Sequence, residues 1–471
     1  MHLHSFPLSL FRLGAIVLLS CFSLSLAGHA KEKSPNVILI FVDDMGWMDL
    51  TCQGSDFYKT PSIDRLAKEG TDFHRFTVAS GVCSPSRTAV MTGHFPARYN
   101  IDGHFAWVPS NQRRNMPDWL DTAAPSLPRF LKKAGYATAH YGKWHLANDM
   151  IPDSPFPSAY GYDDYGSYNC SGPQMFVHDD VKSAIPFMKK SKESDKPFFI
   201  NLWIHEPHTP FHVDPKLQKL FPDLPEADNI YAATLYHADL RIGQLLDALD
   251  EMKISDNTLV IFSSDNGPAR GSPNSPITLS YDSATGPGYG IGAAKGITGG
   301  RRAFKGALME GGIGVPFIAR WPGKIAAGKV DKTSVLSAVD LLPTFCELGN
   351  VKLPKSYKPD GISQVSVLMG KGNPLRKKPI FWRMSAPWPA NESKPDHWVA
   401  YAVVDEQWKL VLNKDQSHAE LFDLVRDPLE SSDLAAKNLE TVKRMKNLLQ
   451  KWLSSIPAKP TGDVFSNLRE N

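Results

Sequence analysis

The sequence predicts an α/β fold in which apolar strands alternate with amphipathic helices. Four short apolar runs have the composition of buried strands, and each ends in or leads directly into charged, amide or histidine side chains. These runs cover residues 36–44, 136–141, 197–204 and 258–263. Between them, apolar side chains recur at helical spacing, most clearly over residues 230–249. Open α/β sheets bind ligands at the carboxyl ends of their strands, so we expect a functional site where the four runs end.

Local signals place two further helices in this first part of the chain. Thr60-Pro61 puts a proline in the first turn of a helix, where its missing N–H costs nothing. A second helix is expected over residues 125–135, closed by Gly135. Both helices fit the alternation of helices and strands that the apolar runs indicate.

The C-terminal part of the chain has a different pattern of predicted secondary structure. Strand-like runs occupy three segments, 379–383, 397–404 and 408–412. A basic helix is expected over residues 434–453. We therefore expect a main domain at 31–376 and a smaller domain at 377–471, built from an antiparallel sheet and a C-terminal helix.

The first 30 residues have the features of a secretory signal peptide. A basic residue precedes the apolar run 13–26, and small residues suited to cleavage follow at Ala27 and Ala30. The run is too short to span a membrane comfortably. We expect an exported product, periplasmic or secreted, although the residues before Cys21 partly resemble a bacterial lipoprotein box.

Composition excludes some classes of protein. The 471 residues carry a formal net charge of +3, and 42% of them are hydrophobic, which suits an ordinary globular protein and argues against nucleic-acid binding. Four cysteines remain after the leader: Cys52, Cys83, Cys170 and Cys346. They are too few for a disulfide framework, and we expect at most one bridge, between Cys52 and Cys170.

The most informative stretch is residues 83–93, with the sequence CSPSRTAVMTG. Pro85 suits the first turn of a helix, so Cys83 would lie at the positive end of that helix beside free backbone N–H groups. Such a position stabilises anions and is expected to lower the pKa of a thiol. Arg87 adds a planar cation shaped to grip a tetrahedral oxyanion with two donors. The stretch indicates a nucleophile held beside a bound sulfate or phosphate.

The same stretch resembles, residue for residue, the Cys-X-Pro-Ser-Arg…Thr-Gly signature of the type I sulfatases. The resemblance implies that a maturation enzyme oxidises Cys83 to formylglycine (3-oxoalanine), whose hydrate is the nucleophile. It also implies the fold of the alkaline phosphatase superfamily, a large central mixed sheet sandwiched by helices. Sulfatase motifs recur in order from about residue 35 to the C-terminal segment 421–428.

Oxygen-bearing side chains follow two of the predicted strands. Asp43 and Asp44 follow the first strand, and Asp265 and Asn266 follow another. A set of hard oxygen ligands suits Ca²⁺ or Mg²⁺ better than Zn²⁺. The resemblance to sulfatases implies a calcium site at these four positions, with the group derived from Cys83 as a further ligand.

Two lysines and two histidines complete the candidate site. Lys143 and His145 lie two residues apart, so an extended chain would point both to one side. The resemblance implies that Lys143, Lys305 and His208 neutralise sulfate oxygens, and that His208 protonates the leaving alcohol. It implies that His145 deprotonates the second hydroxyl of the formylglycine hydrate to expel sulfate. Arg87 and the metal would hold the hydrate.

The expected substrate is a sulfated glycan, since an exported enzyme meets polymers before cytosolic metabolites. Aromatic, amide and cationic side chains suited to an anionic sugar occur at His104, Trp107, Asn111, Arg113, Arg114, Trp388 and His397, although they could equally pack a long loop. Two alternatives remain. One is a phosphonate or phosphate ester hydrolase of the same superfamily, and the other is a non-catalytic binder of sulfated polymers in which Cys83 stays unmodified.

Overall fold

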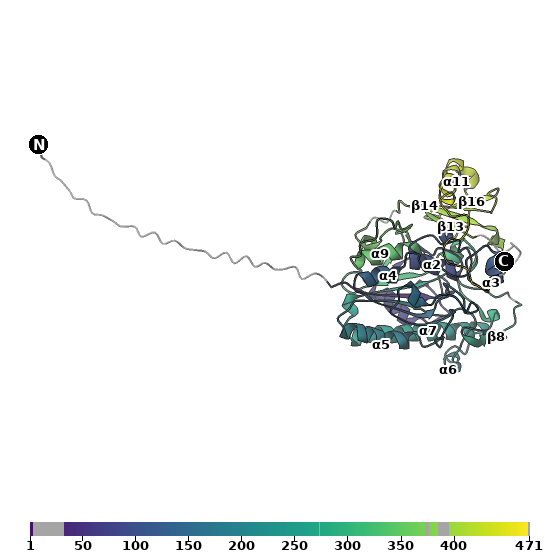
Figure 1. Ribbon diagram of the computed structural model, residues 1–471, viewed down its shortest axis with the longest axis horizontal. Coiled ribbons are helices and arrows are strands. Elements are labelled where there is room, and N and C mark those ends of the chain that lie inside the picture. The colour runs from purple at the N-terminus through teal and green to yellow at the C-terminus, as the bar shows by residue number, and fades with distance from the viewer. Residues whose placement is uncertain (3–32, 273, 373–375, 385–394, 470–471) are drawn as a thin grey trace. The chain divides into compact units, whose positions relative to one another are not determined.

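The computed structural model describes residues 1–2, 33–272, 274–372, 376–384 and 395–469. Residues Ser34–Asn471 form one compact unit, shown in Figure 1. The expected signal peptide lies outside the described residues beyond its first two positions, and so does Trp388.

A large mixed sheet forms the centre of this unit. Its eight strands lie in the order β11 (Lys329–Asp331), β2 (Thr71–Phe73), β10 (Phe317–Arg320), β7 (Thr258–Ser264), β1 (Asn36–Val42), β6 (Phe198–Trp203), β4 (Ala137–Lys143) and β5 (Asp164–Tyr168). The strands from β7 to β5 are parallel, whereas β10 runs antiparallel to both of its neighbours. The predicted α/β fold with a central mixed sheet is confirmed.

Strand β1 lies at the middle of the sheet, and both of its faces are buried. Ile38 pairs with Ile200 of β6 on one side and with Val260 of β7 on the other. Side chains at alternate positions of β1 belong to two different hydrophobic clusters, one on each face of the sheet. Burial on both faces explains why the sequence of this strand is continuously apolar and does not alternate with polar residues.

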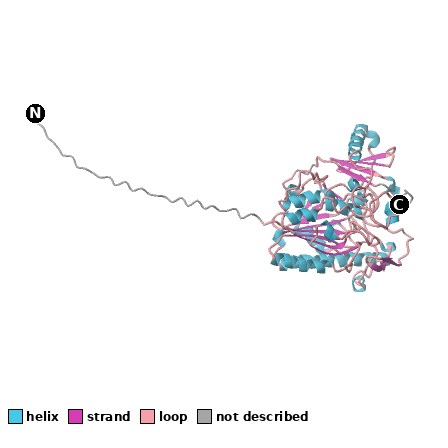
Figure 2. Ribbon diagram, in the orientation of Figure 1, coloured by secondary structure: helices cyan, strands magenta, loops and turns pink. Residues whose placement is uncertain are grey.

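Helices cover both faces of the sheet (Figures 1 and 2). One face packs against α1 (Pro61–Glu69), α5 (Asp180–Glu193) and α7 (Glu226–Glu251). The other packs against α2 (Cys83–Thr92), α4 (Leu127–Lys133) and α9 (Leu341–Leu348). The helices expected after Thr60 and within 125–135 correspond to α1 and α4.

Shorter elements connect these layers. Strands β3 (Phe76–Thr77) and β12 (Leu336–Ser337) pair with each other, and β8 (Leu279–Asp282) and β9 (Gly286–Tyr289) form a hairpin. The short helices are α3 (Val108–Arg113), α6 (Pro215–Gln218), α8 (Glu310–Ile313) and α10 (Val365–Leu368).

A separate antiparallel sheet follows near the C-terminus. It consists of β13 (Ile380–Arg383), β14 (Tyr401–Asp405), β15 (Trp408–Leu412) and β16 (Ala419–Asp423), with α11 (Leu439–Leu453) against β14. The predicted C-terminal sheet and helix are confirmed. The indole Nε1 of Trp382 donates to the carbonyl oxygen of Val78 at 2.7 Å, which ties this sheet to the segment before α2.

The expected disulfide is wrong, because all four described cysteines are free. Cys52 is exposed in the short helix η1 (Thr51–Gln53), which contacts α1 near β10. Cys170 is buried just after β5, at the edge of the sheet beyond β4. The two thiols therefore lie in different parts of the fold.

Within the described part of the chain, no helix combines the length and the apolar character needed to cross a membrane.

Candidate active site

Four adjacent parallel strands converge on one edge of the central sheet. In sheet order these are β7, β1, β6 and β4, so their carboxyl ends lie together. The residues at or just after these strand ends are Asp265 and Asn266, Asp43 and Asp44, His205 to His208, and Lys143 to His145. The strand ends therefore form one polar site, as the sequence predicts.

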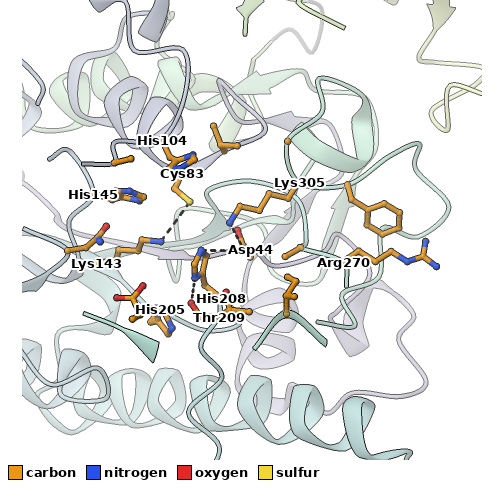
Figure 3. Close-up of a pocket in the computed structure, with 18 of the residues that line it drawn as sticks. Asp44, Cys83, His104, Lys143, His145, His205, His208, Thr209, Arg270 and Lys305 are labelled. Atoms are coloured by element: carbon orange, nitrogen blue, oxygen red, sulfur yellow. Dashed lines mark hydrogen bonds and ion pairs between the residues drawn. The ribbon is translucent and has the colours of Figure 1, made fainter. Parts of the chain in front are cut away.

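A cavity of about 860 Å³ opens at this edge (Figure 3). Six of the predicted site residues line it: Asp44, Cys83, Lys143, His145, His208 and Lys305. The other four, Asp43, Arg87, Asp265 and Asn266, lie behind this lining and are fully buried. The structure thus brings all ten predicted residues into one region, in two layers.

Cys83 is the first residue of α2, as its sequence predicts. Its Sγ lies 3.5 Å from Oδ1 of Asp43 and 3.8 Å from Nζ of Lys143. Burial and the neighbouring Asp43 raise the pKa of the Cys83 thiol. The expected lowering of that pKa is therefore wrong, because loss of solvation outweighs the helix end and the nearby lysines.

Arg87 differs from its expected role as a direct grip on a bound anion. Its guanidinium is fully buried, and Nε and Nη2 donate to Oδ2 of Asp265 at 3.1 and 2.7 Å. Nη2 also reaches Oδ2 of Asp43 at 3.2 Å, and Nη1 donates to the carbonyl oxygen of Lys143 at 3.1 Å. The arginine therefore orients two carboxylates from behind and does not line the cavity, because its donors are already engaged.

Three carboxyl groups share this buried region. Burial and the charge of Asp43 raise the pKa of Asp265 to about 7, and the same two causes raise the pKa of Asp44. Burial alone would also raise the pKa of Asp43, but Lys143 and other basic groups outweigh it and keep that pKa well below its ordinary value. Two of the three carboxyls therefore lack sufficient compensating positive charge.

The surroundings of these carboxyls fit a hard divalent cation. Nδ2 of Asn266 donates to Oδ1 of Asp44 at 2.7 Å, while its buried Oδ1 has no hydrogen-bond partner among the described residues. Ligand atoms of Asp43, Asp44, Cys83 and His208 lie within 4.8 Å of one another. The oxygens of this set are those that Ca²⁺ and Mg²⁺ prefer. His208 therefore lies beside the carboxylates, with Nε2 at 3.7 Å from Oδ2 of Asp44.

The two lysines enter the cavity from opposite sides. Lys143 forms an ion pair with Asp43, and Nζ of Lys305 lies 2.7 Å from Oδ2 of Asp44. Burial alone would lower the pKa of each lysine, but these carboxylates outweigh it and raise both values. Two permanent cations therefore face the Cys83 region, which suits a bound dianion or sulfate group.

Both catalytic-site histidines are neutral, and their backbone contacts fix the tautomers. Burial lowers the pKa of His145 and of His208 well below the usual value, and Lys143 adds to the effect. Nε2 of His145 lies 3.0 Å from the carbonyl oxygen of Phe105, so it donates and leaves its buried Nδ1 as an acceptor without a partner in the described structure. His208 donates from Nδ1 to the carbonyl oxygen of Thr209, which leaves Nε2 as its acceptor, 3.7 Å from Asp44.

Two of these residues have left-handed backbone conformations. Asp44 has φ of 65° and His145 has φ of 50°, values that are costly outside glycine. Strand β4 ends at Lys143, so the extended geometry expected for residues 143–145 is not continuous. Both side chains nevertheless reach the same cavity.

The predicted substrate residues divide into two groups. His104 and His397 line the cavity. Asn111 is instead buried and bonds to Ala106 and Asp118. The lining does not include Trp107, Arg113 or Arg114, and Trp388 lies outside the described residues. Sequence reasoning missed several lining residues, among them Asn148, Asn169, Arg270 and Asp282. They lie on loops or hairpins without a distinctive pattern.

The fold and the site together define a hydrolase of the alkaline phosphatase superfamily. A family model described as sulfatase matches residues 35–351, and a second, described as N-sulphoglucosamine sulphohydrolase, C-terminal, matches residues 301–457. The chain belongs to the sulfatase family, and it is a hydrolase of sulfate esters.

Individual relatives agree with this assignment. The chain is 30% identical over 413 residues to N-acetylgalactosamine-6-sulfatase of dog (Canis lupus familiaris), covering 78% of this chain and 71% of the relative. It is 28% identical over 396 residues to arylsulfatase G of rat (Rattus norvegicus), covering 74% and 71%. Among solved structures it is similar to Ps i-CgsB in complex with k-i-k-neocarrahexaose, with a TM-score of 0.73, 26% identity and coverage of 92% and 95%.

Proposed function

We propose that this sulfatase removes sulfate from a sulfated glycan in an exported compartment. The relatives named for N-acetylgalactosamine-6-sulfatase activity and for binding a neocarrahexaose support a sugar substrate. The cavity supports it too, since its volume of about 860 Å³ suits a sugar ring and it combines apolar surface with amides, histidines and cations.

We further propose that Cys83 is the precursor of formylglycine and that the carboxylate cluster holds Ca²⁺. The proposal depends on one arrangement, namely that Sγ of Cys83 lies within 3.8 Å of both Lys143 and Asp43 at the helix N-terminus that faces the cavity. Asp43, Asp44, Asp265 and Asn266 would supply the oxygen ligands, and position 83 would add one more. The hydrated formylglycine would supply the nucleophilic hydroxyl, and the cation would stabilise negative charge on the sulfate oxygens.

The remaining residues would act on protons and charge. Lys143 and Lys305 bind the sulfate oxygens, because both are cationic and both face position 83. His145 is neutral with a free acceptor at Nδ1, so it can take a proton from a group in the cavity. His208, held through Nδ1 by Thr209, has an unprotonated Nε2, so it would first take up a proton there when the anionic ester is bound and then pass that proton to the departing alcohol.

The domain assignment follows from the same proposal. Residues 1–30 would direct export, residues 31–376 would carry the reacting groups, and residues 377–471 would contribute to the substrate site. The last point is supported by Asp396 and His397, which line the cavity. Arg302 holds Asp396 at 2.6 Å and so connects this segment to the chain near Lys305.

The decisive experiment is the mass of the tryptic peptide 76–87 from protein purified from its native host, with sulfate release measured on the same preparation. We expect an aldehyde in place of the Cys83 thiol, and release of sulfate from N-acetylgalactosamine 6-sulfate or from sulfated galactan oligosaccharides. The variant Cys83→Ala, which has no thiol to oxidise, is the control and should be inactive. An intact thiol without sulfate release would overturn the proposal in favour of a binder, and a preference for phosphate or phosphonate esters would overturn it in favour of the other hydrolase.

A further inference from the structure

A second group of metal-ligating side chains lies on the α5 and α7 side of the segment that carries His208. His178 precedes α5, Glu206 follows β6 and His237 belongs to α7. One ligand atom from each of these three residues lies within 4.8 Å of the other two. None of the three lines the catalytic cavity.

Contacts within this group hold its ligand atoms close together. Nε2 of His178 lies 2.8 Å from Oε1 of Glu206, a carboxylate that is fully buried. The rings of His178 and His237 meet at 4.3 Å between centroids, with 64° between their planes. The buried Nδ1 of His237 has no hydrogen-bond partner among the described residues. A buried nitrogen without a protein partner is costly, and a bound ion or water would satisfy it.

The charges around the group also favour an added cation. Glu206 and Asp180 both bond to Arg241, whose Nη2 lies 2.6 Å from Oε2 of Glu206. Two formal negative charges therefore face one buried positive charge. Because Arg241 binds Oε2, the other oxygen of Glu206 stays on the side of His178 and His237.

We propose that His178, Glu206 and His237 form a second metal site, which binds a divalent transition metal of the zinc type. Two imidazoles and one carboxylate are a ligand set that suits Zn²⁺, with water in the fourth position. Ligand atoms about 2.1 Å from one ion lie within about 4.2 Å of each other, so small side-chain rotations would close the group around it. The oxygen-rich cluster near Cys83 suits a harder cation.

Such an ion would connect three parts of the fold. It would join the turn before α5, helix α7 and the segment after β6, and Glu206 stands two residues before His208 in that segment. The site would act as a structural support for the position of His208. Its existence does not depend on formylglycine or on the identity of the sulfate ester.

Metal content of the full chain tests this site. The protein used carries Cys83→Ala and Asp44→Asn, which remove two ligands from the catalytic cluster. It is equilibrated with Zn²⁺ in excess Ca²⁺, desalted and analysed by plasma mass spectrometry. We expect about one zinc per chain, lost on adding His178→Ala or His237→Ala and retained with His418→Ala, which removes an exposed histidine just before β16. Zinc content that is absent, or unaffected by the first two substitutions, would overturn the proposal.

A second measurement guards against variants that fail to fold. Otherwise unaltered protein loaded with Co²⁺ in excess Ca²⁺ should show visible absorption bands of a four-coordinate nitrogen and oxygen site, and added Zn²⁺ should abolish them. The melting temperature should rise with Zn²⁺ concentration in this protein and not in His237→Ala. Octahedral Co²⁺ spectra together with no zinc-dependent rise would overturn the proposal, whatever the behaviour of the variants.

Discussion

Nη2 of Arg87 lies 2.7 Å from Oδ2 of Asp265, and neither side chain is exposed to solvent. The same guanidinium nitrogen reaches Asp43 at 3.2 Å, so one buried cation bridges residues that follow two neighbouring strands. Arg87 itself is on α2, five residues into the helix that begins at Cys83. This ion pair therefore fixes the helix carrying Cys83 against the carboxylates at the strand ends.

Substituting Arg87 should cost both stability and activity. Arg87→Gln leaves the buried Asp265 without its ion-pair partner and Asp43 with Lys143 alone, and such a loss typically costs about 3–5 kcal/mol of unfolding free energy. Arg87→Lys keeps the charge but cannot donate to Asp265, Asp43 and the Lys143 carbonyl together, so we expect it to lower the unfolding free energy too, by a smaller amount. Urea denaturation measures both variants. Arg426→Gln is the matched control, because Arg426 is 88% exposed and 3.9 Å from Asp423, and it should change stability by no more than about 0.5 kcal/mol.

Removing the acceptor nitrogen of His145 should affect turnover more than binding. His145→Ala should lower kcat by about 10²- to 10³-fold with a much smaller change in KM, the pattern for loss of a group that moves a proton. Sulfate release is measured at equal formylglycine occupancy, which the mass of peptide 76–87 reports. His418→Ala should leave both constants unchanged. A kcat for His145→Ala within a few fold of that of the unsubstituted enzyme would contradict the assigned role.

Calcium should stabilise the folded chain. At a free concentration of about 100 times the dissociation constant, binding adds about 2.7 kcal/mol to the unfolding free energy. We expect the melting temperature to fall when Ca²⁺ is removed with EGTA, and Asp44→Asn to lose this dependence. Asp282→Asn, which alters a carboxyl in the lining of the same cavity, should keep it. Equal melting temperatures in Ca²⁺ and in EGTA would contradict a calcium site at these carboxylates.

Arg270 should contribute to recognition of additional negative charge on the substrate. It is exposed in the cavity lining, and its guanidinium lies 4.7 Å from the centre of the Phe304 ring. Arg270→Ala should raise KM about 10-fold for a multiply sulfated oligosaccharide and leave kcat unchanged, since a hydrogen bond to a charged group contributes about 1.5–3 kcal/mol. A singly sulfated monosaccharide is the control substrate and should show little change. The opposite result, a fall in kcat with both substrates, would place Arg270 nearer the reacting sulfate than its position indicates.

Much of the site could be predicted because strand ends are visible in a sequence. Asp43 and Asp265 follow strands with an apolar centre, and parallel neighbouring strands bring such residues to one edge of a sheet. The antiparallel direction of β10 and the two short strands at its side could not be predicted in this way. They are too short to give a periodic pattern, and tertiary pairing determines them.

Several features of the site depend on burial and could not be predicted from the sequence. The thiol pKa of Cys83 and the inward direction of Arg87 both depend on how much solvent is excluded, which no local pattern records. His178, Glu206 and His237 meet through packing of segments distant in the sequence, so neither spacing nor motif could bring them together.

Asp239 should make stability fall as pH rises through the mildly acidic range. Its carboxylate accepts from the backbone N–H groups of Ser62 and Ile63 at 3.0 and 2.9 Å, which caps α1 from helix α7. Burial nevertheless raises the pKa of Asp239 to about 6, compared with about 3.9 in an unfolded chain. The folded state therefore binds the proton more tightly. Its contribution of about 3 kcal/mol is complete below pH ~3.9 and is lost as pH rises through about 6.

Urea denaturation between about pH 4 and pH 7.5 measures this contribution. Asp239→Asn cannot titrate and can still accept from one of the two N–H groups, so its stability should depend less on pH across this interval. As pH rises, the unfolding free energy of the unsubstituted chain should fall relative to that of the variant. Asp223→Asn, at an exposed position before α7, should instead follow the unsubstituted chain. If Asp239→Asn reproduces the full pH dependence of the unsubstituted chain, the raised pKa is wrong and the buried carboxylate is stabilised by its two N–H donors at every pH.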